Sequence, residues 1–459
     1  MTSPCLNQCQ VMLLQTGNEI AYSTFEMIDS ASFEIILTEF IFRDDEFGQI
    51  TMALLSRKAR EGVRVVLLVD AFRFVVSASY IHFLKLAGVQ VFVFNRPFPR
   101  FLFHLSYRNH AKVLVIDRSR FKTGDSNIGN EYVNWPSDEQ MLSLDIYCEG
   151  SSGSEAYTFA ELLLKSRYVQ EVRTEVLKPF SPYILYFLSR WHSRFINKFL
   201  RPLKIDFPSW VLIPWPVRIE KDDLDLSERS LDQAGRRFQD LKRSSGWMDF
   251  IELKSHLLNV EQCKFLGDQI DLKGTCPGIE VEILNEVRAA KRSIQIVTPY
   301  LLLTKSDQTE IQNALERGVK VEIYTNSFES NDHYGAQLAF EMRKKEYAKI
   351  GDLRIYEFEG PKTLHAKFIV RDCESAIVMA YNLDFRSRFL NVECGLRVQN
   401  SYIANQLSSW VTGRLSRFVL VTANRRALKH SYLSATKGLL DKLLIFGRMI
   451  LVKIFEKQF

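Results

Sequence analysis

The chain has 459 residues, of which 46% are hydrophobic and 25% charged, a composition that is ordinary for a globular protein and excludes a largely disordered chain. This length is sufficient for two or three domains with substantial cores. The formal charge of +6 is small for the length, so charge alone selects neither nucleic acid nor a membrane as the partner.

Seven cysteines are scattered along the chain without a C-x-x-C pair or a nearby histidine at zinc spacing. This spacing argues against a disulfide framework and a structural metal, and it favours a reducing compartment. The N-terminal segment lacks the pattern of a secretory signal, and no uncharged apolar run approaches the ~18 residues of a membrane span. We therefore expect a cytosolic or peripheral protein.

Residues 1–165 are predicted to form a first unit in which strands alternate with helices. FEIILTEFIF, at residues 33–42, has the composition of a buried strand. Residues 58–70 combine the end of a helix, a glycine and a second strand rich in β-branched residues. This alternation is typical of an α/β fold.

The segment NHAKVLVID, at residues 109–117, resembles another buried strand but contains His110, Lys112 and Asp117. Side chains two residues apart on a strand share a face, so His110 and Lys112 are expected to point together. Asp117 has the opposite parity and is expected to support the strand or its neighbour. Asn127 follows ten residues later.

Residues 166–275 are predicted to connect this unit to the next, because prolines interrupt the alternating pattern there. Residues 176–205 contain no acidic residue, and basic residues recur at helical spacing beside large aromatic ones. The pattern suits a helix in an anionic bilayer interface, or a helix packed against the protein with its basic face in water. The residues expected to face the membrane are Arg190, Trp191, Arg194, Lys198 and Arg201.

Residues 276–420 repeat the order of the first unit. SIQIVTPYLLL, at residues 293–303, corresponds to the first strand, and a helix end, a glycine and a strand recur at residues 313–326. LHAKFIVRD follows at residues 364–372, and the polar residues keep the same spacing: His365, Lys367, Asp372 and Asn382. Matching spacing together with matching polar residues predicts two copies of one α/β unit.

The last predicted segment, residues 421–459, contains an amphipathic helix with an apolar arc interrupted by basic residues. Those charges argue against a membrane span. The helix can dock against the protein, mediate oligomers or lie on lipid, and the sequence leaves these alternatives open.

Two imidazoles and two ammonium groups together suit the chemistry of a phosphodiester. Such a substrate needs a nucleophile, a general acid and stabilisation of negative charge. One histidine can attack phosphorus and form a covalent intermediate, while the other, protonated, gives its proton to the leaving oxygen. This chemistry requires no metal and no other cofactor, and none is expected.

The duplicated His, Lys, Asp and Asn pattern resembles the signature of the phospholipase D superfamily. EFIFRDDEFG, GDSNIGNEY, TPYLLL and NLDFRSRFLNVECG resemble its bacterial cardiolipin synthase branch, and the likeness covers roughly residues 10–165 and 275–415. The resemblance implies two α/β/α sandwich lobes with mixed sheets, joined by a helical connector. It also implies one catalytic site at the lobe interface, to which each lobe contributes one histidine and one lysine.

The resemblance further implies roles for individual residues. His110 is expected to attack phosphorus, and His365 to protonate the leaving oxygen and then deprotonate the incoming hydroxyl, although the opposite assignment stays open. Glu393 matches the acidic residue that in this family orients the histidine of its own half, so it is expected to hold His365. Ser143 occupies the corresponding position of the first half, where Asp145, on the same face, can substitute.

Glu39 is a further match to the family, whereas Met379 and Ala380 depart from its pattern. Glu39, in the first matched segment, is expected to bind substrate or support the site, as is Asp145. Met379 and Ala380 stand where the family usually has Gly-Ser before the second asparagine, so a small hydroxyl that helps to hold the phosphate is missing. An altered specificity or a loss of turnover is therefore conceivable.

The sequence thus predicts a phosphatidyltransferase of cardiolipin synthase type, which acts on phosphatidylglycerol, phosphatidylethanolamine or cardiolipin through a phospho-histidine intermediate. It is expected on the cytoplasmic side of the cell membrane as a peripheral protein. The alternatives are a phospholipase D that hydrolyses phospholipids to phosphatidic acid, a phospholipase D-type nuclease, and a catalytically inactive membrane-binding scaffold. Two amphipathic basic segments favour lipid over nucleic acid as the partner.

Overall fold

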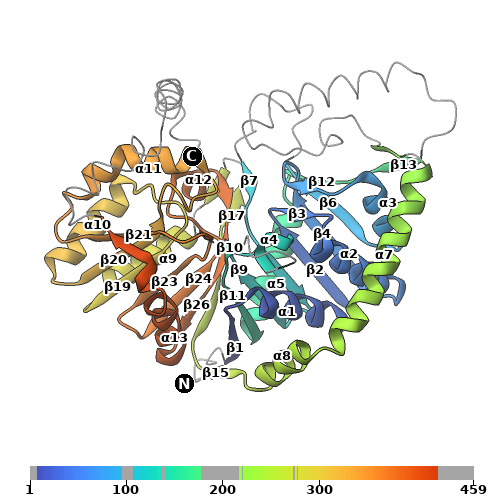
Figure 1. Cartoon of the computed structure of the whole chain (residues 1–459), viewed down its shortest axis with the longest axis horizontal. Coiled ribbons are helices and arrows are strands. Elements are labelled where there is room, and N and C mark those ends of the chain that lie inside the picture. The colour runs from blue at the N-terminus through green and yellow to red at the C-terminus, as the bar shows by residue number, and fades with distance from the viewer. Residues whose placement is uncertain are drawn as a thin grey trace, which may run out of the picture.

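Two mixed β-sheets, each covered by helices, form the two lobes of the protein (Figure 1). The structure, a computed structural model, describes residues 8–95, 107–133, 135, 141–176, 217–219, 221–271, 274–276 and 278–421. The five residues predicted to face the membrane lie outside these ranges, and so does the C-terminal segment beyond residue 421.

The first sheet has nine strands, and its central part is parallel. Its order is β12 (Val169–Glu171), β6 (Gln90–Phe94), β4 (Arg64–Asp70), β2 (Glu34–Glu39), β8 (Val113–Ile116), β9 (Arg120–Gly124), β11 (Asp145–Gly150), β1 (Cys9–Leu14) and β15 (Leu258–Val260). The strands β2, β4 and β6 are parallel to one another, and the other neighbours are antiparallel. Every residue of β2 is buried, as a strand covered on both faces requires.

The second sheet repeats this arrangement with eight strands. In the corresponding order they are β27 (Phe418–Leu420), β21 (Arg354–Phe358), β20 (Lys320–Asn326), β19 (Ser293–Val297), β23 (Phe368–Arg371), β24 (Ser375–Met379), β26 (Cys394–Gln399) and β16 (Cys263–Gly267). The parallel strands β19, β20 and β21 correspond to β2, β4 and β6. Two α/β lobes with mixed sheets, predicted from the duplicated sequence pattern, are therefore confirmed.

Helices cover the outer face of each sheet. The first lobe has α1 (Gly17–Asp29), α2 (Glu46–Arg60), α3 (Ala78–Leu86), α7 (Lys221–Lys242) and α8 (Ser245–Ser255), and the second has α9 (Gly278–Ala289), α10 (Lys305–Glu316) and α11 (Tyr334–Tyr347). Capping boxes begin α1, at Thr16 and Glu19, and α10, at Thr304 and Asp307.

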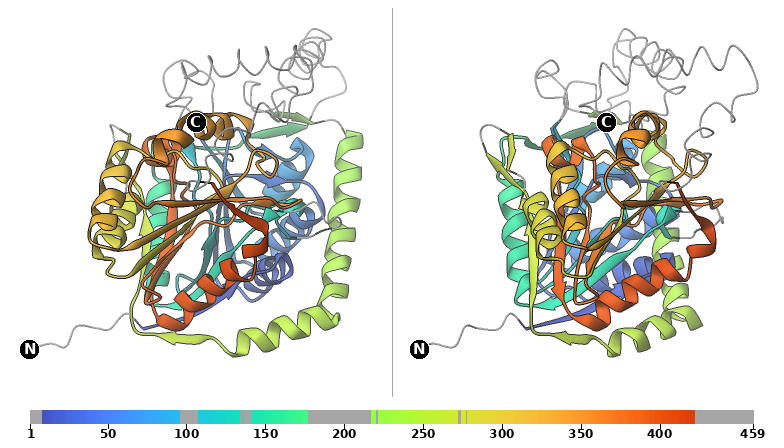
Figure 2. Two further views of the ribbon diagram at one scale, coloured as in Figure 1. Left: turned by 60° about the vertical axis from the view of Figure 1, so that its left-hand side comes forward. Right: turned by 90° about the vertical axis from the view of Figure 1, so that its left-hand side faces the viewer.

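The described part of the predicted connector, residues 166–275, packs with the two lobes. The helices α7 and α8 contribute Phe238, Trp247 and Phe250 to the core of the first lobe, and Figure 2 shows both helices on its outside. The strands β12 and β15 extend the first sheet, whereas β16 belongs to the second. None of the helices within the described ranges is long and apolar enough to cross a membrane.

The inner faces of the two sheets share one hydrophobic core. Val113, Phe121 and Ile146 of the first lobe pack in the same cluster as Phe368 and Leu396 of the second. The helices α5 (Ser152–Leu164) and α13 (Ser401–Thr412) add residues to this cluster. The lobes thus meet across an extended apolar contact, which fixes their relative position.

Two short parallel ladders also cross from one lobe to the other. The strand β7 (Arg108–Asn109) pairs with β25 (Asn391–Val392), and β10 (Met141–Leu142) pairs with β22 (Thr363–Leu364). The two ladders have the same place relative to the motif, because β7 and β22 both end at the residue before a motif histidine. The ladders therefore place His110 and His365 at the interface.

One disulfide corrects the expectation drawn from the cysteines. Cys9 of β1 is bonded to Cys263 of β16, 254 residues away, and the Sγ atoms of this pair and of Cys148 all lie within 4.8 Å of one another. The prediction relied on local spacing, which does not reveal two cysteines brought together by different sheets. The cysteine pattern therefore gives no argument for a reducing compartment.

We expect this disulfide to stabilise the joined lobes. Because it closes a very long loop in the unfolded chain, Cys9→Ser should lower the free energy of unfolding by about 2–4 kcal/mol. Thermal unfolding followed by circular dichroism should show a lower midpoint for this variant, and reductant should lower that of the unchanged protein. Cys373→Ser, which removes a free thiol, is the control. Equal midpoints with and without reductant would contradict the expectation.

Candidate active site

The backbone of each motif histidine is hydrogen-bonded to the opposite lobe. The His110 N–H donates to the carbonyl oxygen of Val392 at 2.9 Å, and the His365 N–H donates to that of Leu142 at 3.0 Å. Both histidines lie between the interlobe ladder and the next long strand, not within a strand as the hydrophobic pattern predicted. The chain leaves one sheet contact and enters another at this point, which is why a local pattern does not reveal the break.

Each motif lysine folds back onto its own histidine. The Nζ atoms of Lys112 and Lys367 donate to the carbonyl oxygens of His110 and His365, both at 2.8 Å. Lys367 Nζ also lies 3.3 Å from His365 Nε2. All four residues are at most 8% exposed. Burial lowers the pKa of both lysines, that of Lys367 to about 8, although carboxylates around them oppose this effect.

The charges of both lobes act on both imidazoles. Burial holds the pKa of His110 well below its usual value, and the ammonium groups of Lys112 and Lys367 lower it further. The same three influences lower the pKa of His365, on which His110 also acts. His110 acts on the pKa of His365, and the same two lysines act on the pKa of both rings. The two histidines therefore belong to one site.

Two carboxylates cross the interface to the histidines. Glu393 Oε2 lies 2.8 Å from His110 Nδ1, and Asp125 Oδ1 lies 2.8 Å from His365 Nδ1. Both carboxylates are fully buried, and burial raises the pKa of Asp125 to about 6 and that of Glu393 to about 7. With Nδ1 engaged in this way, Nε2 of each ring is the atom that can face substrate, and at His365 this atom also lies 3.3 Å from Lys367 Nζ.

These contacts correct two expectations about the acidic residues. Glu393 contacts His110 of the opposite half and not His365 of its own, because β25 pairs with β7 and brings Glu393 across the interface. Asp145 contacts neither histidine. Its side chain accepts hydrogen bonds from the Asp125 and Ser126 N–H groups and forms an ion pair with Lys122 at 3.0 Å, so it supports the turn that holds Asp125.

Asp125 is the residue that sequence reasoning missed. It lies in the segment GDSNIGNEY, two residues before Asn127, so the sequence shows that an acidic residue is present near the motif. The sequence does not show the direction of its side chain. This direction depends on the end of β9, from which the side chain reaches His365 of the other lobe.

The two motif aspartates support the sheets from the far end of the strands. Asp117 accepts hydrogen bonds from three consecutive backbone N–H groups at residues 32–34, and Asp372 from three at residues 291–293. Both have positive φ, 49° and 54°, in the turns that join β8 to β9 and β23 to β24. Burial acts to raise the pKa of each, but the three N–H donors hold it below its usual value.

The remaining predicted residues lie in the interior near the site. The Asn127 Oδ1 accepts from the Ile41 N–H at 3.0 Å. Asn382 is buried, and its Oδ1 has no hydrogen-bond partner among the residues that the structure describes. Glu39 ends β2, where burial raises the pKa of its carboxyl well above the usual value while Lys122 and Lys112 oppose the shift.

Aromatic rings and further charges surround the two histidines. The ring of Phe40 contacts His110 edge-on at 4.8 Å between centroids, and the guanidinium groups of Arg386 and Arg73 act on the pKa of His110. Tyr132 contacts His365 at 5.2 Å between centroids, and the Asp332 carboxylate acts on the pKa of His365. Basic and acidic groups therefore both act on the site.

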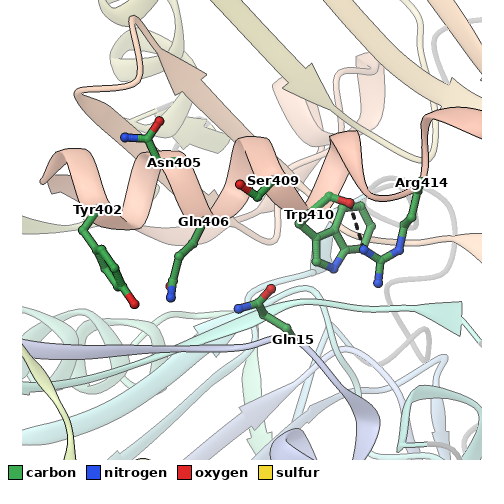
Figure 3. Close-up of a pocket in the computed structure, with 7 residues that line it drawn as sticks. All are labelled: Gln15, Tyr402, Asn405, Gln406, Ser409, Trp410 and Arg414. Atoms are coloured by element: carbon green, nitrogen blue, oxygen red, sulfur yellow. Dashed lines mark hydrogen bonds between the residues drawn. The ribbon is translucent and has the colours of Figure 1, made fainter.

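A separate surface pocket contains none of the predicted site residues. It has a volume of about 430 Å³ and lies between α13 and Gln15, which follows β1 (Figure 3). Its other lining residues are Tyr402, Asn405, Gln406, Ser409, Trp410 and Arg414. The histidine pair lies elsewhere, beside the interlobe ladders.

Two duplicated α/β lobes that together build one centre of two histidines and two lysines define the class of phospholipase D-type enzymes. The family described as cardiolipin synthase, PLD-like domain, matches residues 24–144 and 283–414, together more than half of the chain. The chain belongs to this family.

Two similar proteins match most of this chain. Cardiolipin synthase A of Pseudomonas syringae pv. syringae (strain B728a) is 25% identical over 422 residues, which are 89% of this chain and 69% of the relative. Minor cardiolipin synthase ClsB of Bacillus subtilis (strain 168) is 25% identical over 416 residues, 90% of this chain and 83% of the relative. The crystal structure of phosphatidylserine synthase from Haemophilus influenzae Rd KW20 has the same fold, with a TM-score of 0.62, 16% identity and coverage of 98% and 95%.

Anion binding should depend on the charge of Lys367. Because its pKa is about 8, Lys367 is charged below that pH and loses its proton above it, so affinity for tungstate should fall as pH rises through about 8. Lys367→Arg keeps its charge and should shift this loss to higher pH. Calorimetric titration between pH 6 and 10 measures the effect. Lys165→Arg, on the exposed surface, is the control, and identical pH profiles for all three proteins would contradict the expectation.

The motif aspartates should matter for stability more than for chemistry. Asp372→Ala leaves three backbone N–H groups without their acceptor, and we expect a loss of at least about 1.5–3 kcal/mol in the free energy of unfolding. Chemical denaturation measures this loss, with the exposed Asp352→Ala as the control. A variant that unfolds like the unchanged protein but has lost its activity would show that Asp372 acts in the reaction.

Proposed function

We propose that the protein is a phosphatidyltransferase of cardiolipin synthase type, which joins the phosphatidyl group of one phospholipid to a hydroxyl of another. The observation that carries this proposal is the pair of hydrogen bonds in which each motif histidine is held at Nδ1 by a carboxylate of the opposite lobe. This arrangement leaves two Nε2 atoms for one phosphorus, together with two buried ammonium groups.

In the first half of the proposed reaction, His110 Nε2 attacks phosphorus. The N–P bond forms as the bond from phosphorus to the leaving alcohol breaks, and His365 gives its proton to the leaving oxygen. Lys112 and Lys367 stabilise the negative charge that develops on the phosphoryl oxygens. The hydrogen bond that His110 Nδ1 donates to Glu393 fixes the His110 ring with Nε2 free to attack.

In the second half, a hydroxyl of the acceptor lipid replaces the enzyme. His365 removes the hydroxyl proton, the oxygen attacks phosphorus, and the N–P bond breaks to release His110. Burial and the lysines lower the pKa of both histidines, which leaves the His110 ring unprotonated and nucleophilic near neutral pH. A bound phosphodiester anion offsets the positive charge of the lysines, which raises the pKa of His365 and allows it to carry the proton.

The charged groups of the site support phospholipid substrates with polar head groups. The ammonium groups of Lys112 and Lys367 suit the phosphate of the phosphatidyl group that is transferred. A carboxylate suits hydrogen-bond donors, and Asp332, which accepts from the Tyr300 hydroxyl at 2.8 Å, is exposed and acts on the pKa of His365. A glycerol hydroxyl and the ammonium group of ethanolamine both fit this chemistry, so phosphatidylglycerol, phosphatidylethanolamine and cardiolipin are the proposed substrates.

Peripheral attachment to the cytoplasmic side of the cell membrane is part of the same proposal. It rests on the basic and aromatic residues of the sequence between residues 190 and 201. Each Lys or Arg near an anionic membrane surface contributes about 1 kcal/mol to attachment. A lipid transfer reaction also requires that the site reach a bilayer, which holds both the donor and the acceptor.

The reaction products distinguish transfer from hydrolysis. The purified chain, incubated with vesicles of phosphatidylglycerol alone or mixed with phosphatidylethanolamine, should produce cardiolipin that mass spectrometry detects. His110→Asn and His365→Asn vesicle reactions are the controls and should yield none. Phosphatidic acid as the main product would instead indicate a hydrolase, and unchanged lipids in every mixture would contradict the proposal.

The roles of the two histidines can be separated by trapping the covalent intermediate. With a phosphodiester whose leaving group needs no proton, His365→Asn should accumulate a phospho-enzyme, because the acceptor step lacks its base. His110→Asn should not be labelled, since it lacks the nucleophile. Intact-mass measurement of both variants decides the assignment, and an adduct on the His110 variant alone would reverse the roles.

A further inference from the structure

The two lobes present different residues at equivalent positions of their interlobe ladders. His110 donates its N–H to Val392, and the next residue is Glu393, which contacts the His110 ring. His365 donates its N–H to Leu142, and the next residue is Ser143. Ser143 thus occupies in the first lobe the position that Glu393 occupies in the second, but its side chain carries no charge.

Asp125 comes from another part of the repeated unit. In the first lobe Val113 pairs with Thr123, and in the second the corresponding Phe368 pairs with Val378. Two residues beyond Thr123 is Asp125, whereas two residues beyond Val378 is Ala380. The position that supplies a carboxylate in the first lobe therefore supplies only a methyl group in the second.

The Asp125 side chain is held on both oxygens. Its Oδ1 lies 2.8 Å from His365 Nδ1, and its Oδ2 accepts from the Leu144 N–H at 2.7 Å. The carboxyl group is fully buried, and the charge of Lys367 and the Leu144 N–H favour its charged form. Glu393 is supported differently, because its second oxygen accepts from the Asn391 amide at 3.0 Å.

We propose that Asp125 is the positioning residue of His365 and replaces, from the end of β9, the carboxylate that position 143 lacks. In this role Asp125 keeps the proton of the neutral ring on Nδ1 and turns Nε2 towards the reacting oxygen. The effect on turnover rests on the proposed function, since it assumes that His365 is the acid and base. The effect on the ring does not, and this difference separates the two claims.

A double variant tests the replacement directly. Asp125→Ala combined with Ser143→Glu gives the first lobe the same pair of residues as the second, Ala380 and Glu393. Asp125→Ala alone should lower kcat by about 10²–10⁴-fold with a small change in KM, because general acid–base catalysis contributes that much. The double variant should recover at least about tenfold of this loss if the new carboxylate reaches the ring. Asp352→Ala, an exposed position, is the control.

Nuclear magnetic resonance of the ¹⁵N-labelled His365 ring supplies a readout independent of lipid turnover. In the unchanged protein and in the double variant, the neutral ring should carry its proton on Nδ1, whereas Asp125→Ala should show a mixture of tautomers. Asp125→Asn, which keeps the volume, should show the same loss if the alanine variant folds poorly. An unchanged tautomer in both single variants, or full kcat in Asp125→Ala, would overturn the inference. A tautomer that changes as expected in a protein without transferase activity would overturn the proposed function and leave the inference standing.

Discussion

The hydrogen bonds of His110 with Glu393 and of His365 with Asp125 make one site out of the two lobes. Each crosses from one lobe to the other, so neither half of the chain contains a complete histidine and acid pair. The shared hydrophobic core, the two short ladders and the disulfide all hold the lobes in the one register that allows these bonds. A small shift of one sheet along the other would separate both pairs at once.

The site also concentrates more buried charge than a core normally accepts. Lys112, Lys367, Asp125 and Glu393 are each almost inaccessible to solvent, and burial shifts the pKa of every one towards its neutral form. An isolated ion in such a place is costly, but the alternation of two cations with two anions offsets much of this penalty. A phosphodiester adds a negative charge beside the lysines and therefore stabilises their protonated form. The free site is in this sense prepared for an anion.

Much of the architecture could be predicted because the sequence contains two copies of one α/β unit. The spacing of His110 and His365 within similar strand and helix patterns gave the two lobes, and the parity of Asp117 placed its side chain in support of the neighbouring strand. Contacts between the two halves could not be predicted in the same way. Glu393 was assigned to the histidine nearest in the repeat, although pairing of β25 with β7 directs it to the other one.

The same limit explains the other corrections. Cys9 and Cys263 lie in different sheets, so no spacing rule relates them. Asp145 begins β11, and its oxygens are occupied by the turn at Asp125 and Ser126. In each case the residue type was visible in the sequence, but its partner depended on the packing of two lobes that are distant along the chain.

A crystal structure with bound vanadate can show whether both lobes act on one phosphorus. Vanadate adopts the geometry of a phosphoryl group in transfer, so it should bind once per chain between the lobes. We expect a bond from vanadium to Nε2 of one histidine, a hydrogen bond from Nε2 of the other to the opposite apical oxygen, and contacts from Lys112 and Lys367 to the equatorial oxygens. Two vanadates, one on each lobe, or one vanadate bound to a single histidine with the other ring turned away, would contradict it.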